Sequence, residues 1–232
     1  MGRNHLRVYS EMADVEVAAV ADVDAGALQR AAEACPELVE GAYPVATYQD
    51  YRRMLERERL DAVSIAVPTG LHRQVALAAV QAGVPILVEK PIAPSVEEGL
   101  AILEAAGEAG VLVMVGHIER FNPAVIALAQ RLDEGALGRI YQVQARRIGP
   151  FAQRVRDVGV VHDLATHDIG VMRYLLRSQV RSVYAQVQAG VKTNREDALL
   201  ALLQFEDDVV GLLDVNWLSP QKVRELVVLG EG

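Results

Sequence analysis

The segment from Val88 to Pro91 contains the first pair of side chains that could do chemistry, Glu89 and Lys90. It follows directly on a short apolar run, which places the pair at the carboxyl end of a parallel strand, where open α/β sheets bind their ligands. Pro91 restricts the backbone of Lys90 to extended conformations. The pair can therefore face a ligand bound at this edge, and a solvated strand-end pair without a ligand is the alternative.

The preceding apolar run, residues 62–67, ends in the same way. Pro68, Thr69 and His72 follow it, so we expect these three residues along the same crevice at the carboxyl ends of the strands. An ordinary helix-face histidine is the alternative interpretation of His72.

Asp22 lies twenty residues after Gly2, at the end of the first predicted strand. In a dinucleotide-binding βαβ unit, an acid at about this distance accepts hydrogen bonds from the adenosine ribose and repels a 2′-phosphate, which favours NAD over NADP. A turn-forming or helix-capping aspartate is the alternative. A strand followed by G-x-G should precede Gly2, and the sequence shows none.

Asp163 and His167 stand four residues apart in a helical pattern, so their side chains fall on one face about one turn apart. A histidine next to a carboxylate is a plausible general base with a pKa near neutral, although structural pairs of this kind are common. His162 adds a possible metal ligand. Its spacing to His167 is unsuitable, no HExxH motif or cysteine cluster exists, and we therefore expect no metal site.

A run of arginines without an intervening acid occupies residues 139–156 of a chain that is otherwise acidic. Guanidinium groups bind pyrophosphate in bidentate fashion, so the run could recognise an anionic substrate. A solvated face, or ion pairs to another domain, is the alternative. The run comprises Arg139, Arg146, Arg147, Arg154 and Arg156.

The composition sets limits on the class of protein. The chain has 232 residues, of which 51% are hydrophobic, a formal net charge of −8 and one cysteine, Cys35. Disordered, collagen-like and disulfide-framework proteins are excluded by this profile, and the acidic balance argues against a general nucleic-acid binder. No apolar stretch reaches the length of about 20 residues that a bilayer span needs, and no signal peptide opens the chain. We expect a cytoplasmic setting and no membrane or nucleic-acid partner.

Short apolar runs alternate with helical patterns through the first half, which predicts βαβ units around a parallel sheet, with a helix over residues 3–11 before them. Ser95 and Glu98 have capping-box spacing, and Gly83 and Gly110 follow two of the predicted helices. The predicted strands are 15–21, 62–67, 86–89 and 111–115, and the helices are 24–35, 47–57, 71–82 and 95–109.

After Gly116 the pattern changes to longer strands joined by polar turns, with Asp207 and Asp208 in a predicted hairpin. We therefore expect a Rossmann-like α/β domain over 1–118 and an α+β domain with an open, mostly antiparallel sheet over 119–232. The predicted helices of this part are 122–134 and 161–176, and the strands are 140–148, 181–190, 197–205, 209–217 and 223–229.

With these residues in hand, the sequence resembles the Gfo/Idh/MocA family of NAD(P)-dependent sugar oxidoreductases. The resemblance covers essentially the whole chain. Within the family, GHIERFNP and the ending DVNWLSPQKVRELVVLGEG are most similar to the branch of UDP-N-acetylglucosamine 3-dehydrogenases. The motifs that carry it are AVADVD at 19–24, VPTGLH at 67–72, VEKP at 88–91, GHIERFNP at 116–123 and DVGVVHDLATHDIG at 157–170.

The resemblance implies transfer of a hydride from a sugar carbon to NAD. Lys90 would position and polarise the hydroxyl, His167 would be the general base, and Asp163 would support the site. The residues expected at the cofactor are Gly2, Asp22, Pro68, Thr69, His72, Glu89 and Lys90, and those expected at a nucleotide sugar such as UDP-N-acetylglucosamine are Arg120, Asn122, Arg147, Arg154 and Arg156.

Two departures from the family pattern stand out. The first strand and the opening glycines of the phosphate loop are absent, and the chain ends before the family's second domain is complete, so we expect a truncated protein with weakened NAD binding. The open sheet implies a homo-oligomer. Another sugar or inositol dehydrogenase, or a catalytically silent protein that binds a dinucleotide or a sugar, is the alternative.

Overall fold

The described part of the chain, residues 1–34, 45–151 and 158–232 of a computed structural model, falls into two units, Met1–Gly116 and His117–Gly232. The expectations for Cys35, Arg154 and Arg156 concern residues outside the described part.

The first unit is built on parallel strands, as the alternation of apolar runs and helical patterns predicts. β1 (Ala19–Ala21) pairs with β2 (Ala46–Tyr48), and β3 (Val63–Ile65), β4 (Ile86–Val88) and β5 (Val113–Val115) form a sheet with β4 in the centre. Within the described residues no ladder joins β1 to β3. The helices are α1 (Gly2–Ser10), α2 (Ala25–Ala34), α4 (Tyr51–Arg57), η1 (Thr69–Leu71), α5 (His72–Gln81) and α6 (Val96–Ala109).

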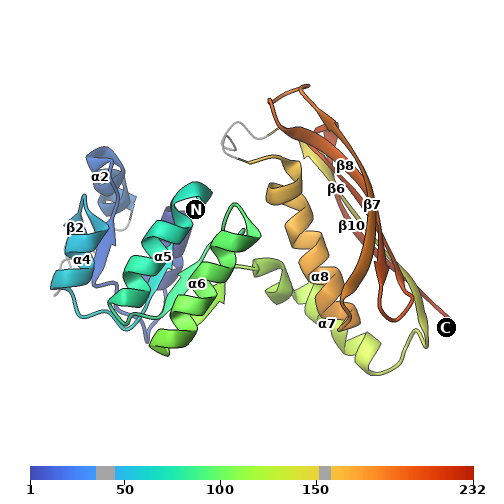
Figure 1. The fold of residues 1–232 in the computed structure, drawn as a ribbon, viewed down its shortest axis with the longest axis horizontal. Coiled ribbons are helices and arrows are strands. Elements are labelled where there is room, and N and C mark those ends of the chain that lie inside the picture. Colours follow the sequence, from blue (N-terminus) through green and yellow to red (C-terminus); the bar gives the residue numbers. More distant parts are fainter. Residues whose placement is uncertain (35–44, 152–157) are drawn as a thin grey trace. The chain divides into compact units, whose positions relative to one another are not determined.

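Helices α5 and α6 lie side by side against the three-stranded sheet (Figure 1). Their apolar faces and the strands form one core, which includes Ile65, Val88, Ala76 and Ile102. The ends of α6 follow the local sequence signals, because Ser95 accepts a hydrogen bond from the backbone of Glu98 and Gly110 takes the left-handed conformation, φ +67°.

The predicted helix over 47–57 is wrong in its first part. Residues Ala46–Tyr48 form the short strand β2 beside β1, and α4 begins only after Asp50, whose side chain accepts a hydrogen bond from the backbone N–H of Arg52 at 3.0 Å. A strand of three residues is too short for its alternating pattern to be recognised in the sequence. In the structure, pairing with β1 satisfies the backbone hydrogen-bonding groups of β2.

The second unit holds a five-stranded sheet in the order β10-β6-β9-β8-β7. Only β6 and β9 are parallel, which confirms the expected open, mostly antiparallel sheet. Helices lie on one face of this sheet (Figure 1). The elements are η2 (Ile118–Phe121), α7 (Pro123–Asp133), β6 (Ile140–Pro150), η3 (Val161–Ala165), α8 (Thr166–Leu176), β7 (Val180–Ala189), β8 (Glu196–Phe205), β9 (Val210–Asn216) and β10 (Leu218–Gly230).

Two local features of the second unit add detail to the predictions: one predicted helix begins irregularly, and one predicted hairpin forms without glycine. The stretch expected as one helix over 161–176 opens with a π-helical turn, η3, before α8. The expected hairpin between β8 and β9 is present without a glycine, because Asp208 itself takes a positive φ of 65°. Aspartate tolerates this conformation better than most residues.

The core of the second unit lies between the helices and the inner face of the sheet. Met172 of α8 packs among Val143, Phe205 and Val215, all with no exposed surface. No helix in the described residues is long and apolar enough to cross a bilayer.

Candidate functional site

The carboxyl edge of the parallel strands in the first unit carries the polar residues that the sequence singled out. Asp22 follows β1, Pro68 and Thr69 come shortly after β3, and Glu89 and Lys90 follow the central strand β4. This is the edge at which ligands of open α/β sheets bind.

Glu89 is almost buried, 6% exposed, and its carboxylate oxygen Oε1 lies 2.7 Å from Nε2 of His5 in α1. Burial acts to raise the pKa of Glu89, but the hydrogen bonds and charges of His5 and Lys90 together outweigh it and hold the pKa below its usual value. A Cβ on Gly116, which follows β5, would lie 3.4 Å from Oε2 of Glu89. The contact between His5 and Glu89 therefore ties α1 to the residue next to Lys90.

His5 is a site residue that sequence reasoning missed. The available signal was its position three residues after Gly2, in the first turn of the helix that starts there. The start of this helix lies beside the end of β3, since a Cβ on Gly2 would be in ordinary contact, 3.9 Å, with Ala66.

His72 lies at the same edge but is 1% exposed. Its Nδ1 is 2.9 Å from the carbonyl oxygen of Pro91 and its Nε2 is 3.0 Å from that of Val67. The ring thus joins the segments that follow β3 and β4, and it supports the edge through the backbone rather than by presenting a nitrogen to a ligand.

Asp22 is exposed at the end of β1. Its backbone N–H donates to the carbonyl of Tyr48 at 3.0 Å, and its Oδ1 accepts from the backbone N–H of Asp24 at 2.9 Å. One carboxylate at the end of β1, the start of a helix at Gly2 and a lysine at the end of β4 are groups suited to ribose hydroxyls, phosphates and a reacting hydroxyl respectively. This donor set fits a dinucleotide.

In the second unit, Asp163 and His167 flank the junction between the π turn η3 and α8. The backbone N–H of Asp163 donates to the carbonyl of Gly159 at 3.0 Å. Both side chains interact electrostatically with nearby charged residues. Burial acts to raise the pKa of Glu119, Arg147 is the main group that lowers it, and the charge of His167 adds to this lowering. Burial lowers the pKa of Arg224, and the charge of Asp163 acts in the opposite direction.

Arg147 holds this cluster together. Its Nε lies 2.9 and 3.0 Å from the two carboxylate oxygens of Asp168, its Nη2 lies 2.8 Å from Oδ1 of Asp168, and its Nη1 lies 2.9 Å from Glu119. Burial raises the pKa of Asp168, and Arg147 only partly opposes this. For Glu119, by contrast, the effect of burial is outweighed by Arg147, so that its pKa is lowered.

The described residues expected at the substrate each have a different partner within the second unit. The guanidinium of Arg147 is committed to two carboxylates, and Oδ1 of Asn122 accepts from Ala124 N at 3.0 Å as the N-cap of α7. Arg120 lies over the ring of Tyr174, 5.9 Å from its centre. Arg224, directly opposite Arg147 on the neighbouring strand, was missed because its proximity depends on strand register.

The expected residues thus form two groups, one in each unit. Lys90 lies beside the Glu89–His5 pair, and Asp163 and His167 lie beside the cluster of Arg147. Among the described residues, no group of three or more His, Cys, Asp or Glu side chains is arranged to hold a metal ion.

Comparisons with known proteins agree with both units. Residues 1–117 match the model of an oxidoreductase family with an NAD-binding Rossmann fold, and residues 125–232 match the GFO/IDH/MocA C-terminal domain. The UDP-N-acetylglucosamine 3-dehydrogenase of Acidithiobacillus ferrooxidans is 32% identical over 226 residues, which are 97% of this chain and 67% of that protein. Inositol 2-dehydrogenase 2 of Saccharopolyspora erythraea is 32% identical over 222 residues, 93% of this chain and 63% of that protein.

Among solved structures, the WlbA dehydrogenase from Bordetella pertussis, in complex with NADH and UDP-GlcNAcA, has a TM-score of 0.89 and 27% identity. That match covers 99% of this chain and 72% of the WlbA chain. The chain spans 67% and 63% of the lengths of the two curated relatives named above. On the match of both domains, the chain belongs to the GFO/IDH/MocA family of oxidoreductases.

Proposed function

We propose that the protein oxidises a secondary hydroxyl of a sugar with NAD as hydride acceptor, and that the sugar is carried by a nucleotide, such as UDP-N-acetylglucosamine. The observation that carries the proposal is the position of Lys90 at the carboxyl end of the central parallel strand, beside the buried Glu89–His5 pair, in a chain that matches the family over both domains. The single cysteine favours a cytoplasmic setting, and NAD is present in the cytoplasm as a hydride acceptor.

The proposed roles are those that the family resemblance implies, and the chemistry of each side chain suits its role. When bound, NAD accepts the hydride at its nicotinamide ring. Lys90 donates a hydrogen bond to the substrate oxygen and polarises the O–H bond, while His167 accepts the hydroxyl proton, so that the products are a ketone, NADH and one proton. Asp163 supports the protonated imidazole of His167.

The proposed cofactor contacts lie along the edge described above. Gly2 offers the start of α1 to the phosphates, Asp22 accepts hydrogen bonds from the ribose, and Thr69 lines the edge after β3. Glu89 acts through its neighbours, because His5 already holds its carboxylate.

Similarity to one curated relative and to one solved structure favours a nucleotide sugar over a free sugar as the substrate. UDP-N-acetylglucosamine 3-dehydrogenase is one of the curated relatives, and the WlbA structure contains UDP-GlcNAcA. Inositol 2-dehydrogenase has a similar identity, so inositols are the second candidate class of substrate.

The decisive experiment measures NADH formation with a panel of UDP-sugars, free sugars and inositols, for the wild type and for Lys90→Ala and His167→Ala. We expect turnover with a UDP-sugar and a loss of about a hundredfold or more in kcat for each variant. Lys222→Ala, an exposed lysine of β10, is the matched control and should keep wild-type kcat.

The panel separates the candidate functions. Turnover of an inositol but not of UDP-sugars would replace the nucleotide sugar by the second candidate. Wild-type rates in Lys90→Ala or His167→Ala would reject the assigned roles. No turnover, together with thermal stabilisation by NAD or a UDP-sugar, would favour a silent binding protein.

We also propose that two copies of the chain associate through the outer face of the five-stranded sheet. This face is apolar in rows that cross the strands, since Tyr184, Leu202 and Leu212 are register partners on β7, β8 and β9. Tyr184 and Leu202 are exposed to 67% and 45%, although a lone sheet face in water is normally polar.

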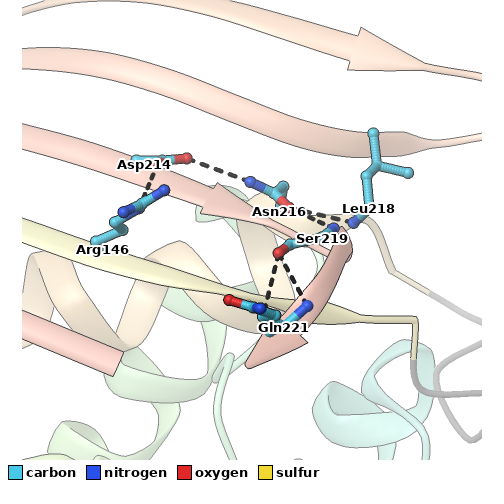
Figure 2. A network of polar contacts seen from close by, with 6 residues as sticks. All are labelled: Arg146, Asp214, Asn216, Leu218, Ser219 and Gln221. Atoms are coloured by element: carbon cyan, nitrogen blue, oxygen red, sulfur yellow. Dashed lines mark hydrogen bonds and ion pairs between the residues drawn. The ribbon is translucent and has the colours of Figure 1, made fainter. Parts of the chain in front are cut away.

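The next row of this face is mixed: Leu200, 62% exposed, is the register partner of Asp214, and Arg146 lies on the other side of Asp214. Asp214 accepts from Nε of Arg146 on the neighbouring strand at 3.1 Å and from the amide of Asn216 (Figure 2). The same asparagine accepts the backbone N–H groups of Leu218 and Ser219, which fixes the turn from β9 into β10. Exposed apolar side chains next to a polar pair whose hydrogen bonds are already made suit a self-complementary contact.

Sedimentation of wild type and Leu202→Glu tests the contact. We expect a dimer or larger assembly for the wild type and a monomer for Leu202→Glu, while Leu112→Glu, at an exposed leucine of the first unit, stays assembled. A monomeric wild type, or an assembled Leu202→Glu, contradicts the proposal.

A further inference from the structure

The helix that carries Asp163 and His167 contains an irregularity between these two residues. From Val161 to Ala165 it is π-helical, and the backbone N–H of Thr166 is directed at the carbonyl of Val161, five residues back. In an α-helix this N–H would bond to the carbonyl of His162, four residues back. Single π turns of this kind are rare and occur frequently at functional sites.

The side chain of Thr166 takes the place of the displaced backbone donor. Its hydroxyl Oγ1 donates to the carbonyl oxygen of His162 at 2.9 Å. A threonine hydroxyl that bonds four residues back normally bends an α-helix. Here it bonds the carbonyl of His162, which in a regular α-helix would accept the backbone N–H of Thr166 itself. The hydroxyl of Thr166 therefore makes a hydrogen bond that stabilises the π-helical turn.

The π turn changes how Asp163 and His167 are placed. With regular α-helical geometry, residues four apart lie about 40° from each other around the axis. A turn closed over five residues alters that angle between Asp163, inside the turn, and His167, just after it.

The helix is fixed immediately after this point. Asp168, the next residue, is bound by the buried guanidinium of Arg147, so α8 cannot rotate to compensate for a change in the turn. Among the charged groups, Glu119 interacts electrostatically with His167, and Arg224 interacts with Asp163. Glu119 is in turn paired with Arg147, which also binds Asp168.

We propose that Thr166 is a positioning residue for the reaction, whose hydroxyl maintains the π turn and thereby sets the placement of the Asp163 carboxylate relative to the His167 imidazole. This inference rests on the proposed function for its effect on catalysis, but its structural part concerns only the second unit.

The test compares Thr166→Val, which keeps the shape and removes the hydroxyl, with Thr166→Ser, which keeps the hydroxyl. We expect Thr166→Ser to stay within about twofold of the wild-type kcat and Thr166→Val to lose about tenfold to a hundredfold, with the KM for NAD unchanged. Thr166→Ala replaces the valine variant if the latter does not fold, as judged by thermal unfolding.

A readout independent of activity is the titration of the His167 ring, followed by NMR on the full chain and assigned with His167→Gln. In Thr166→Val the midpoint should fall relative to wild type, because a displaced carboxylate stabilises the imidazolium less, and in Thr166→Ser it should not move. Equal midpoints and equal kcat in both variants overturn the proposal. If the wild type oxidises no sugar, the proposed function fails, while the titration still decides the role of Thr166.

Discussion

The carboxylate of Asp197 accepts a hydrogen bond from the indole N–H of Trp217 at 2.6 Å, in a position with no solvent exposure. Its other hydrogen bonds come from the loop between β7 and β8, namely from the backbone N–H groups of Val191, Lys192 and Thr193 and from the Thr193 hydroxyl. One buried carboxylate thus joins this loop to the start of the last strand.

Asp197→Asn should destabilise the protein by about 2 to 3 kcal/mol, because in either orientation the amide turns an N–H group toward donors. The free energy of unfolding is measured with denaturant and the fluorescence of Trp217, the single tryptophan. Asp207→Asn, in the exposed hairpin, should change it by less than about 0.5 kcal/mol.

The same variant has a defined pH dependence. Burial acts to raise the pKa of Asp197, but the hydrogen bonds from Trp217 and the loop outweigh it and lower the pKa below its ordinary value of 3.8. A lowered pKa stabilises the folded state above the ordinary value, and this stabilisation is lost as the pH falls through the folded pKa. The difference between wild type and Asp197→Asn should therefore be constant near neutral pH and shrink below about pH 4. A constant difference down to acid unfolding contradicts this account.

His5→Ala should lower stability by about 2 kcal/mol, since it leaves the Glu89 carboxylate buried without its partner. The first helix offers a matched control, Arg7→Ala, whose ion pair with Glu11 is exposed and worth little. Thermal unfolding of both variants near neutral pH makes the comparison. Equal effects of the two substitutions would show that the His5–Glu89 contact does not hold α1 to the sheet.

The pair also predicts behaviour in acid. Because the pKa of Glu89 is lowered by His5, its contribution is present above the ordinary value of 4.5 and disappears as the pH falls through the folded pKa. The difference in the free energy of unfolding between the wild type and His5→Ala should thus shrink as the pH falls below about 4.5.

Arg147→Met should cost about 3 to 5 kcal/mol, because it leaves the buried carboxylate of Asp168 unpaired. The double variant Arg147→Met/Asp168→Leu should recover a large part of that loss, since apolar replacement of a buried pair is often tolerated. Arg181→Met removes an exposed pair with Asp208 and is the control. If the double variant is as unstable as the sum of the two single variants, the pair is not coupled as the geometry implies.

Local signals in the sequence predicted the features that depend on neighbouring residues. Ser95 and Gly110 mark the ends of α6, and Val88 with the preceding apolar residues places Glu89 and Lys90 at a strand end. These features arise from backbone hydrogen bonds within a few residues, so composition and spacing are sufficient to recognise them.

Features that depend on distant partners could not be predicted. For the arginine run the sequence leaves a substrate anion, a solvated face and ion pairs as alternatives, because the carboxylate partners of Arg147, Asp168 and Glu119, are 21 and 28 residues away in sequence. The π turn was invisible for another reason, since the apolar positions of residues 161–176 fit a single helix. His5 meets Glu89 only because α1 packs beside the end of the sheet, across 84 residues of chain.

Asp22→Ala tests the cofactor preference that the sequence predicts. Removal of the carboxylate takes away the acceptor for the ribose hydroxyls and the repulsion of a 2′-phosphate, so the Kd for NADH should rise by about tenfold and that for NADPH should fall. Asp24→Ala is the control, because that carboxylate is occupied by the backbone N–H of Gly26 and by Arg30. Both Kd values are measured by titration of nucleotide fluorescence, which does not depend on turnover. An unchanged ratio in Asp22→Ala, or the same change in Asp24→Ala, would remove Asp22 from the cofactor site and leave it as a turn residue after β1.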